Sequence, residues 1–286
     1  ARGDGEAAGE AANGLVGRVK EFRDDAGLRG DFHPHDVSLG VKEIIALPEK
    51  VLEERFQCTP ESGAAYTLVG HTHGIEGGGF IYTNRASLSL GIVVKIDSLY
   101  QSKLQPHQVL DKFKEHPLVQ RLVADGEVVE YSAQTVHRGG FHLATQLYGD
   151  GYVVAGSAAR LLLNNIMTLR GMDFAVLSGA AAAKAIIEAN KKGSYSKADL
   201  AVYEEKLKET PIYHDWKLFK DTYPLLENKR LFEVYPELAV GVMEDLFAPS
   251  AEGASRLLAS ARKNMNGKVS MMELVKDMIQ IGRGVV

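Results

Sequence analysis

The stretch GYVVAGSAARLLLNNIMTLRGMDF, residues 151–174, carries residue types that could bind a dinucleotide cofactor. An apolar strand ends at Gly156, where the missing side chain lets a dinucleotide approach the backbone closely. A long alanine-rich helix begins near Gly171 and would direct the positive end of its dipole toward the same crevice. A buried strand packed on a buried helix gives the same pattern, so the spacing leaves both interpretations open. The residues of the two turns that would form the cofactor site are Gly156, Ser157, Arg170, Gly171, Met172 and Asp173.

A second glycine-rich segment, GGGF at residues 77–80, precedes a strand-like run. Gly78 and Gly79 are candidate cofactor contacts, because glycine lets a backbone come close to a planar ligand. The alternative is a glycine-rich turn that only prepares the strand.

Four histidines suggest a metal site. His71 and His73 are two residues apart at the end of an expected strand, so both side chains would point to one face. His137 and His142 flank a glycine pair at the end of another strand. If those strand ends meet, four imidazoles converge, and neutral imidazole is a common metal ligand. The alternative is four solvent-facing loop histidines.

The elements that must position these residues change in character along the chain. Strand-like runs alternate with short helices up to about residue 150, and residues 84–86 separate the strands of an expected antiparallel hairpin. Pro117 is expected to break or kink a helix over residues 106–124. A long helix over residues 172–190 is followed by helical patches. The expected strands cover residues 36–47, 64–72, 80–83, 87–96 and 127–136, and the later helices cover 196–208, 213–226, 236–247, 251–262 and 270–281.

These elements predict an α+β fold with three parts. Residues 1–30 form a leader with a short helix, and residues 31–150 form an antiparallel sheet domain with inserted helices. Residues 151–286 hold a cofactor-domain strand and helix, followed by a C-terminal helical layer.

Composition narrows the function. The chain has 286 residues, is 45% hydrophobic and carries a formal net charge of −4, which disfavours nucleic acid as a partner. Its one cysteine, Cys58, excludes an intramolecular disulfide and a cysteine-held iron–sulfur cluster, and it fits a cytoplasmic location. No apolar run reaches the roughly 18 residues of a transmembrane helix. No residue set typical of nucleophilic or acid–base catalysis stands out, so catalytic residues are not assigned.

Several long blocks resemble one family of flavoproteins. They are similar to the electron-transfer-flavoprotein:quinone oxidoreductases, and in particular to the FixC-type dehydrogenase subunit. The similarity runs from about Gly27 to the C-terminus. The blocks that carry it are YGDGYVVAGSAA, TLRGMDFAVLSGAAAA, GGGFIYTNRASLSLGIVV, SLGVKEIIALPEKVLEERF and YPELAVGVMEDLF.

The resemblance implies a p-hydroxybenzoate-hydroxylase-like architecture that binds FAD. It implies electron transfer between an electron-transfer flavoprotein and a quinone or a ferredoxin-like partner, which FixC-type members have as a separate subunit. It also places the GGGF segment against the flavin ring. A cytoplasmic protein, with peripheral attachment to a membrane as the alternative, agrees with these partners.

Two departures from the family pattern weigh against flavin chemistry. The family's strand–GxGxxG–helix unit, which holds the ADP half of FAD, is not found in this chain. Ser157 replaces the family's aspartate, and Arg160 replaces a glycine that lets the cofactor pass. Without the ADP lobe, a sheet face and a helix flank would be exposed, and a homodimer or the segment Leu15–Phe22 could cover them. This pattern suggests a truncated or engineered form.

Two hypotheses therefore remain. The first is a FixC-like, FAD-linked oxidoreductase whose activity is impaired. The second is a flavoprotein scaffold without flavin chemistry, which binds a small apolar ligand, a histidine-held metal, or nothing.

Overall fold

A computed structural model describes residues 34–285, apart from residues 60, 73, 145 and 248–255. The expected leader, the segment Leu15–Phe22 and His73 lie outside the described residues. The chain divides into two compact units. Unit 1 comprises residues 1–40 and 133–223, and unit 2 comprises residues 41–132 and 224–286. The chain thus passes between the units three times, whereas the sequence predicted one change of character near residue 150.

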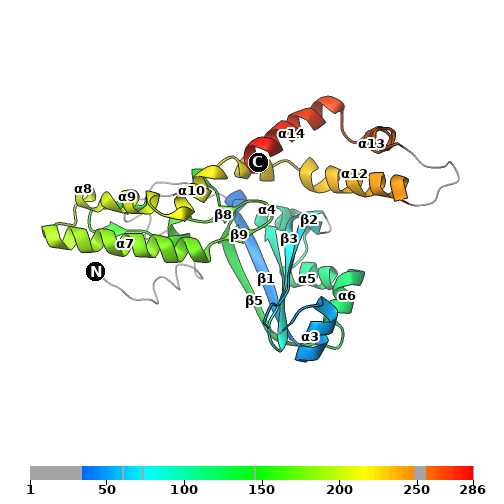
Figure 1. Ribbon diagram of the computed structural model, residues 1–286, viewed down its shortest axis with the longest axis horizontal. Coiled ribbons are helices and arrows are strands. Elements are labelled where there is room, and N and C mark those ends of the chain that lie inside the picture. The colour runs from blue at the N-terminus through cyan, green and yellow to red at the C-terminus, as the bar shows by residue number, and fades with distance from the viewer. Residues whose placement is uncertain (1–33, 60, 73, 145, 248–255, 286) are drawn as a thin grey trace. The chain divides into compact units, whose positions relative to one another are not determined.

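A five-stranded sheet forms the first half of the described chain (Figure 1). Its strand order is β2-β3-β4-β1-β5, so β2 and β5 are the edge strands. Side chains that are 0–2% exposed line one face, among them Val41, Ile45, Ile81, Leu90 and Ile92. The strands are β1 Val37–Ala46, β2 Ala65–Thr72, β3 Ile75–Thr83, β4 Ser87–Lys95 and β5 Glu127–His137.

The hairpin turn and the helix break that the sequence predicts in this region are both confirmed. β3 and β4 pair antiparallel with Thr83 opposite Leu88, and the Asn84 N–H donates to the Ser87 carbonyl at 2.8 Å to close the turn. Pro117 separates two helices, because proline fits the first turn of a helix but not its interior. The helices beside the sheet are α3 Glu49–Phe56, α4 Ile96–Ser102, α5 Pro106–Lys114 and α6 Pro117–Val123.

Unit 1 contains the expected long helix, α7 Met172–Lys192, and the strand that precedes it. In its core, Phe174 and the buried alanines of α7 pack with Tyr203, Leu207 and Trp216. The expected helix over residues 196–208 is divided at Ala201. The short elements are η1 Pro34–Asp36, η2 Phe141–Leu143, β6 Tyr148–Gly149, β7 Tyr152–Val153, η3 Gly156–Ala159, β8 Leu163–Asn164, β9 Leu169–Arg170, α8 Lys197–Leu200, α9 Val202–Lys208, α10 Pro211–Leu218 and α11 Thr222–Leu226.

Three helices complete unit 2. They are α12 Arg230–Phe247, α13 Leu257–Met265 and α14 Met271–Val285, and α12 packs against α13. α12 begins six residues before the expected start at Pro236, which lies inside the helix. None of the helices in the described ranges is long and apolar enough to cross a membrane. The predicted α+β class, with an antiparallel hairpin sheet followed by helices, is confirmed.

Candidate functional site

The turn after β7 is fixed to α7 by buried hydrogen bonds. The Gly156 N–H donates to Ser178 Oγ at 2.9 Å, and Ser178 Oγ donates to the Phe174 carbonyl at 2.5 Å. The Tyr203 hydroxyl donates to the Val154 carbonyl at 3.0 Å, and burial raises the pKa of this phenol. These contacts give the strand end one defined position on the helix.

Glycine at position 156 has a conformational reason. Its φ is +60°, a left-handed conformation that other residues rarely adopt, and an added Cβ would lie 3.2 Å from the Ala175 Cβ. The predicted close approach of strand and helix is therefore present at Gly156 and Ala175.

Ser157 and Arg160 follow in the 3-10 turn η3. Ser157 is half-buried, while Arg160 is 5% exposed and donates from its guanidinium to the Leu143 carbonyl at 3.4 Å. Leu161 and Leu163 are each 1% exposed and belong to the core of unit 1. The two leucines thus point into the protein, where their burial stabilises the unit.

Two carboxylates pair with Arg170 at the start of α7. Arg170 donates from Nε to Asp173 Oδ2 at 3.0 Å and from Nη1 to Asp215 Oδ2 at 2.8 Å. The hydrogen bond from Arg170 holds the pKa of Asp215 below its ordinary value. Arg170 and Asp173 thus pair across the first turn of the helix. Asp215 was missed, because it lies on α10, 45 residues farther along the chain.

The backbone of this helix start remains available to a ligand. Gly171 is the N-cap residue and gives no side-chain hydrogen bond, so the first N–H groups of α7 are not capped by it. Met172 beside it is 87% exposed. Together with the Gly156 turn, these features meet what the flavin-ring and ribityl part of FAD would need. Ser157 offers a hydroxyl there in place of a carboxylate.

A stripe of apolar residues on α7 is exposed. Val176 is 70% exposed and Ile187 is 56% exposed, while Ala181 and Ala185 on the opposite side are buried in the core. We call this surface the α7 stripe. Its members, which recur at helical spacing on one side, are Met172, Val176, Ala180, Ala183 and Ile187.

The glycines of β3 have packing neighbours. A Cβ on Gly79 would lie 2.7 Å from Cζ of Phe113 on α5, and a Cβ on Gly78 would lie 2.4 Å from the Leu68 carbonyl oxygen. Phe113 therefore fills the space beside Gly79 in which a planar ligand was expected. In unit 2 these glycines allow close packing of strands and helix.

The histidines predicted to bind metal are not brought together by the sheet. His71 lies on β2 and His137 ends β5, and these are opposite edge strands with three strands between them. His142 lies in η2, where its ring stands edge-on to Phe141. Within the described ranges, no group of three or more His, Cys, Asp or Glu side chains is placed to hold a metal ion. The strand order therefore gives no support to a site shared by His71 and His137.

A polar cluster lies next to the candidate flavin turns in unit 1. The Tyr223 hydroxyl donates to Asp36 Oδ1 at 2.5 Å, and the Arg138 guanidinium lies 5.5 Å from the centroid of the Tyr223 ring. Gly140 has a φ of +141°, and an added Cβ there would lie 3.3 Å from the Tyr223 Cβ. The glycine pair is visible in the sequence, but its partner Tyr223 lies far along the chain and gives no local signal.

Leu162 connects this cluster to the helix start. An added Cβ on Gly139 would lie 2.5 Å from Leu162 Cδ2, and one on Gly171 would lie 3.3 Å from Leu162 Cδ1. The glycine pair at 139–140 and the N-cap of α7 thus pack on the same leucine. This places the Asp36–Tyr223 pair in the same neighbourhood as the candidate flavin site.

Two family models match the chain. The model described as "ETF-QO, ubiquinone-binding" matches residues 37–136, and "ETF-QO/FixC family C-terminal domain" matches residues 222–285. Protein FixC of Escherichia coli strain K12 is 40% identical over 286 residues, which are 96% of this chain and 66% of that protein. The probable electron transfer flavoprotein-quinone oxidoreductase YdiS of the same strain is 33% identical, over 95% of this chain and 62% of that protein.

The chain therefore spans somewhat less than two thirds of the length of these relatives. Among solved structures, a triple mutant of the flavin-dependent brominase Bmp2 superposes with a TM-score of 0.54 at 17% sequence identity. That match covers 93% of this chain and 60% of the brominase, and it supports a shared p-hydroxybenzoate-hydroxylase-like fold. With the matches to both family models, the chain belongs to the electron-transfer-flavoprotein:quinone oxidoreductase and FixC family.

Proposed function

We propose that the chain supplies the flavin-ring side and the quinone side of a FixC-type oxidoreductase. In this role it takes electrons from an electron-transfer flavoprotein and passes them to a quinone, with a ferredoxin-like subunit as an additional acceptor. The observation that carries the proposal is the pair of turns at Gly156 and Gly171, which are fixed on α7 by Ser178 and by Leu162. FAD, when bound, supplies the redox chemistry.

Each residue of the turns has a role in this proposal. Gly156 lets the cofactor approach the backbone, and the Ser157 hydroxyl is positioned to bond a ribityl hydroxyl. The uncapped N–H groups at the start of α7 favour negative charge on the ring. Arg170 is held by Asp173 and Asp215, so it orients the helix start and adds no net positive charge.

The ADP half of FAD needs a further binding lobe. We propose that such a lobe packs on the α7 stripe, because this apolar surface is exposed beside the candidate flavin turns. A second copy of the chain on the same stripe would give the homodimer that the sequence suggests. The protein would act in the cytoplasm and attach peripherally to a membrane, where quinones reside.

The second candidate function is a scaffold without flavin chemistry. Arg160 and Leu161 favour it, because both buried side chains fill space at the turn. In that case the chain binds no flavin, with or without an added lobe.

Flavin binding separates the two candidates. The purified chain would be mixed with FAD, alone and together with the part of Escherichia coli FixC that the chain does not match. We expect stoichiometric flavin absorbance with the added lobe and little flavin bound to the chain alone. The variant Ser157→Asp should bind FAD more tightly in the presence of the lobe, by about tenfold for one charge-assisted hydrogen bond. Gln134→Glu, which adds a negative charge on the exposed side of β5, is the control. Absence of flavin from every mixture would favour the scaffold.

A further inference from the structure

The sheet of unit 2 has a second face, opposite to its buried apolar face. β3 directs Gly78, Phe80 and Tyr82 to this second face, because side chains alternate along a strand. Val69 on β2 and Val93 on β4 lie opposite Gly78 in the registers of the two neighbouring strands. Tyr82 is 42% exposed and Val69 is 40% exposed. We call this surface the open sheet face.

The middle of the open sheet face suits a flat ring. Gly78 has no side chain and is flanked by the two valines. The rings of Phe80 and Tyr82 stack with their centroids 5.0 Å apart. The Phe80 ring packs over Gly91, where an added Cβ would lie 2.3 Å from the Phe80 Cζ. These residues lie within residues 37–136, which match the family model described as ubiquinone-binding.

A charged cluster closes one end of this face. Lys95, the last residue of β4, is 9% exposed. Glu76 lies opposite it on β3, where the register runs one pair beyond Gly77 and Val94. Lys95 Nζ lies 3.4 Å from Glu76 Oε2 and 3.0 Å from Glu227 Oε2. Two carboxylates therefore share one ammonium group.

Glu76 has one oxygen that this cluster does not hydrogen-bond. The Glu76 side chain is 14% exposed, and its Oε2 is buried and accepts no hydrogen bond from the residues that the structure describes. The Glu76 N–H donates to Ser98 Oγ on α4 at 3.0 Å, which fixes this end of β3. Glu76 and Gly78 are two residues apart on one face, about 7 Å along the strand. The carboxyl group is therefore within reach of a ring that lies on Gly78.

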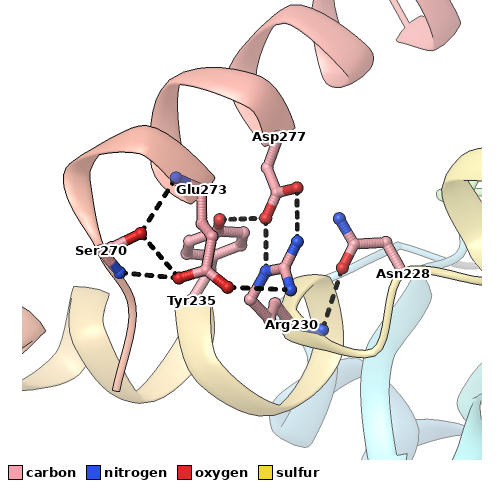
Figure 2. Close-up of polar contacts among 6 residues, drawn as sticks. All are labelled: Asn228, Arg230, Tyr235, Ser270, Glu273 and Asp277. Atoms are coloured by element: carbon pink, nitrogen blue, oxygen red, sulfur yellow. Dashed lines mark hydrogen bonds and ion pairs between the residues drawn. The ribbon is translucent and has the colours of Figure 1, made fainter. Parts of the chain in front are cut away.

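Glu227 connects the cluster to solvent. Its side chain is 42% exposed, and its Oε2 accepts a hydrogen bond from Lys95 Nζ. The residues that follow it are fixed, because the Arg230 N–H donates to Asn228 Oδ1 at 3.2 Å and Arg230 Nε donates to Asp277 on α14 at 2.7 Å (Figure 2). The three charged side chains thus form a continuous series from solvent to the open sheet face.

We propose that Glu76 delivers a proton to a quinone that is reduced on the open sheet face, and that Lys95 and Glu227 resupply this proton. The inference rests on the proposed function, which supplies the two electrons. Reduction of a quinone to a quinol also needs two protons, one on each oxygen. A positioned carboxylic acid that donates a proton in the reaction is a general acid.

The proton transfers balance over the three side chains. The O–H bond of the Glu76 carboxylic acid breaks and an O–H bond forms on the quinone oxygen beside it, while the other quinone oxygen takes its proton from solvent. Glu76 is left as a carboxylate. Lys95 then gives a proton to Glu76 and receives one from Glu227, which is protonated again by solvent.

Binding of quinone and quinol to the full chain without flavin is the first test. Equilibrium dialysis under argon measures the affinity for decylubiquinone and for its reduced form, decylubiquinol. A quinol hydroxyl can donate to the Glu76 carboxylate, whereas a quinone carbonyl cannot. We expect Glu76→Leu to weaken binding of the quinol by about tenfold, the loss of one charge-assisted hydrogen bond, and to leave binding of the quinone unchanged.

The rate of flavin reoxidation is the second test, with FAD and the added FixC lobe present. Stopped-flow absorbance follows the reduced flavin after mixing with decylubiquinone or with ferricyanide, which takes electrons but no protons. We expect Glu76→Gln to slow reoxidation by decylubiquinone by about tenfold or more and to leave reoxidation by ferricyanide unchanged. Glu76→Asp should restore part of the rate, since it keeps a carboxyl group. Glu227→Gln should slow the reaction with decylubiquinone in repeated turnover, because it removes the resupply of protons.

Glu127→Gln is the matched control, because it makes the same chemical change at an exposed position at the start of β5. Circular dichroism confirms that each variant is folded, and Glu227→Gln carries the test if the Glu76 variants do not fold. The inference is overturned if the unchanged chain binds neither form of decylubiquinone, or if Glu76→Leu weakens both forms equally. Equal slowing with both electron acceptors would mean a structural role only and would also overturn it. Failure of the proposed function is distinct, because flavin then does not bind or is not reoxidised by ferricyanide, while the dialysis still decides on Glu76.

Discussion

Single buried side chains determine the geometry of the candidate flavin site. Ser178 is fully buried and serves both as acceptor for Gly156 and as donor to Phe174. The Leu162 side chain packs beside both Gly139 and Gly171. Replacing Ser178 or Leu162 by a smaller residue would shift a turn. Neither side chain is itself a candidate cofactor contact. The site is therefore sensitive to residues that a search for cofactor contacts would overlook.

Gly79 provides a test at the residue scale. We expect Gly79→Ala to lower the free energy of unfolding by about 1–3 kcal/mol, because the new methyl group overpacks against the Phe113 ring. Adding Phe113→Leu should recover part of that loss, since the smaller side chain leaves room. Urea unfolding of the two single variants and the double variant gives the coupling between the sites.

Gly282→Ala is the matched control for this series. An added Cβ at Gly282 meets no described atom within 4 Å, and this residue lies inside α14. The change should therefore raise stability by roughly 0.5–1 kcal/mol, the usual gain of alanine over glycine in a helix. If Gly79→Ala were as harmless as the control, Gly79 would not be a packing position.

At the scale of elements, α14 is held by one buried carboxylate. The hydrogen bond from Arg230 lowers the pKa of Asp277 to about 2, below the ordinary carboxyl value near 4. The unfolded chain therefore binds this proton more readily than the folded chain. The stabilisation is fully present above the ordinary pKa and is lost as the pH falls through about 2.

The variant Asp277→Asn should show this pH dependence by comparison with the unchanged chain. At pH 7 we expect it to be less stable by about 3 kcal/mol, because the Arg230 charge loses its buried partner. The difference should shrink as the pH approaches 2. Glu237→Gln, which removes an exposed pair with Lys268, should change stability by about 0.5 kcal/mol or less. Urea unfolding midpoints of the variant and the unchanged chain at several pH values provide the measurement. A stability difference that stays constant with pH would refute the pairing of Asp277 with Arg230.

The elements that the sequence predicted well are those with local causes. Pro117 fixes a helix start, and the Asn84–Ala86 turn lies directly between the strands that it joins. The sheet order has no such local signal, because nothing near His71 or His137 specifies that their strands occupy opposite edges. One sequence alone therefore does not show whether the predicted histidine ligands could meet.

The residues of the candidate site were also predicted where the cause is local and missed where it is not. Gly156 and Gly171 were found because glycine at a turn is visible in sequence. Asp215 and the Asp36–Tyr223 pair were missed, because their partners lie 45 and 187 residues away. Long-range hydrogen bonds leave no periodic or compositional pattern in one sequence.

At the scale of the whole molecule, the α7 stripe is the surface on which we propose that an added FAD-binding lobe packs. We expect Val176→Asp to weaken association with an added FixC lobe by about tenfold or more, because a charge would be buried in an apolar contact. The folding of the chain itself should not change, since Val176 is 70% exposed. Lys184→Asp, an exposed change on the same helix outside the stripe, is the control. Isothermal titration of the lobe into each variant measures the effect, and equal affinities would place the lobe elsewhere.

The discontinuity of the two units has a consequence for biosynthesis. Unit 2 combines residues 41–132 with residues 224–286, and the residues between them belong to unit 1. On the ribosome, the strands of the sheet therefore emerge long before the helices that complete their unit. The nascent chain must keep a partly finished unit soluble while the whole of the intervening stretch is translated. A premature stop after residue 223 would release a finished first unit attached to an unfinished second one, which is a natural substrate for chaperones and proteases.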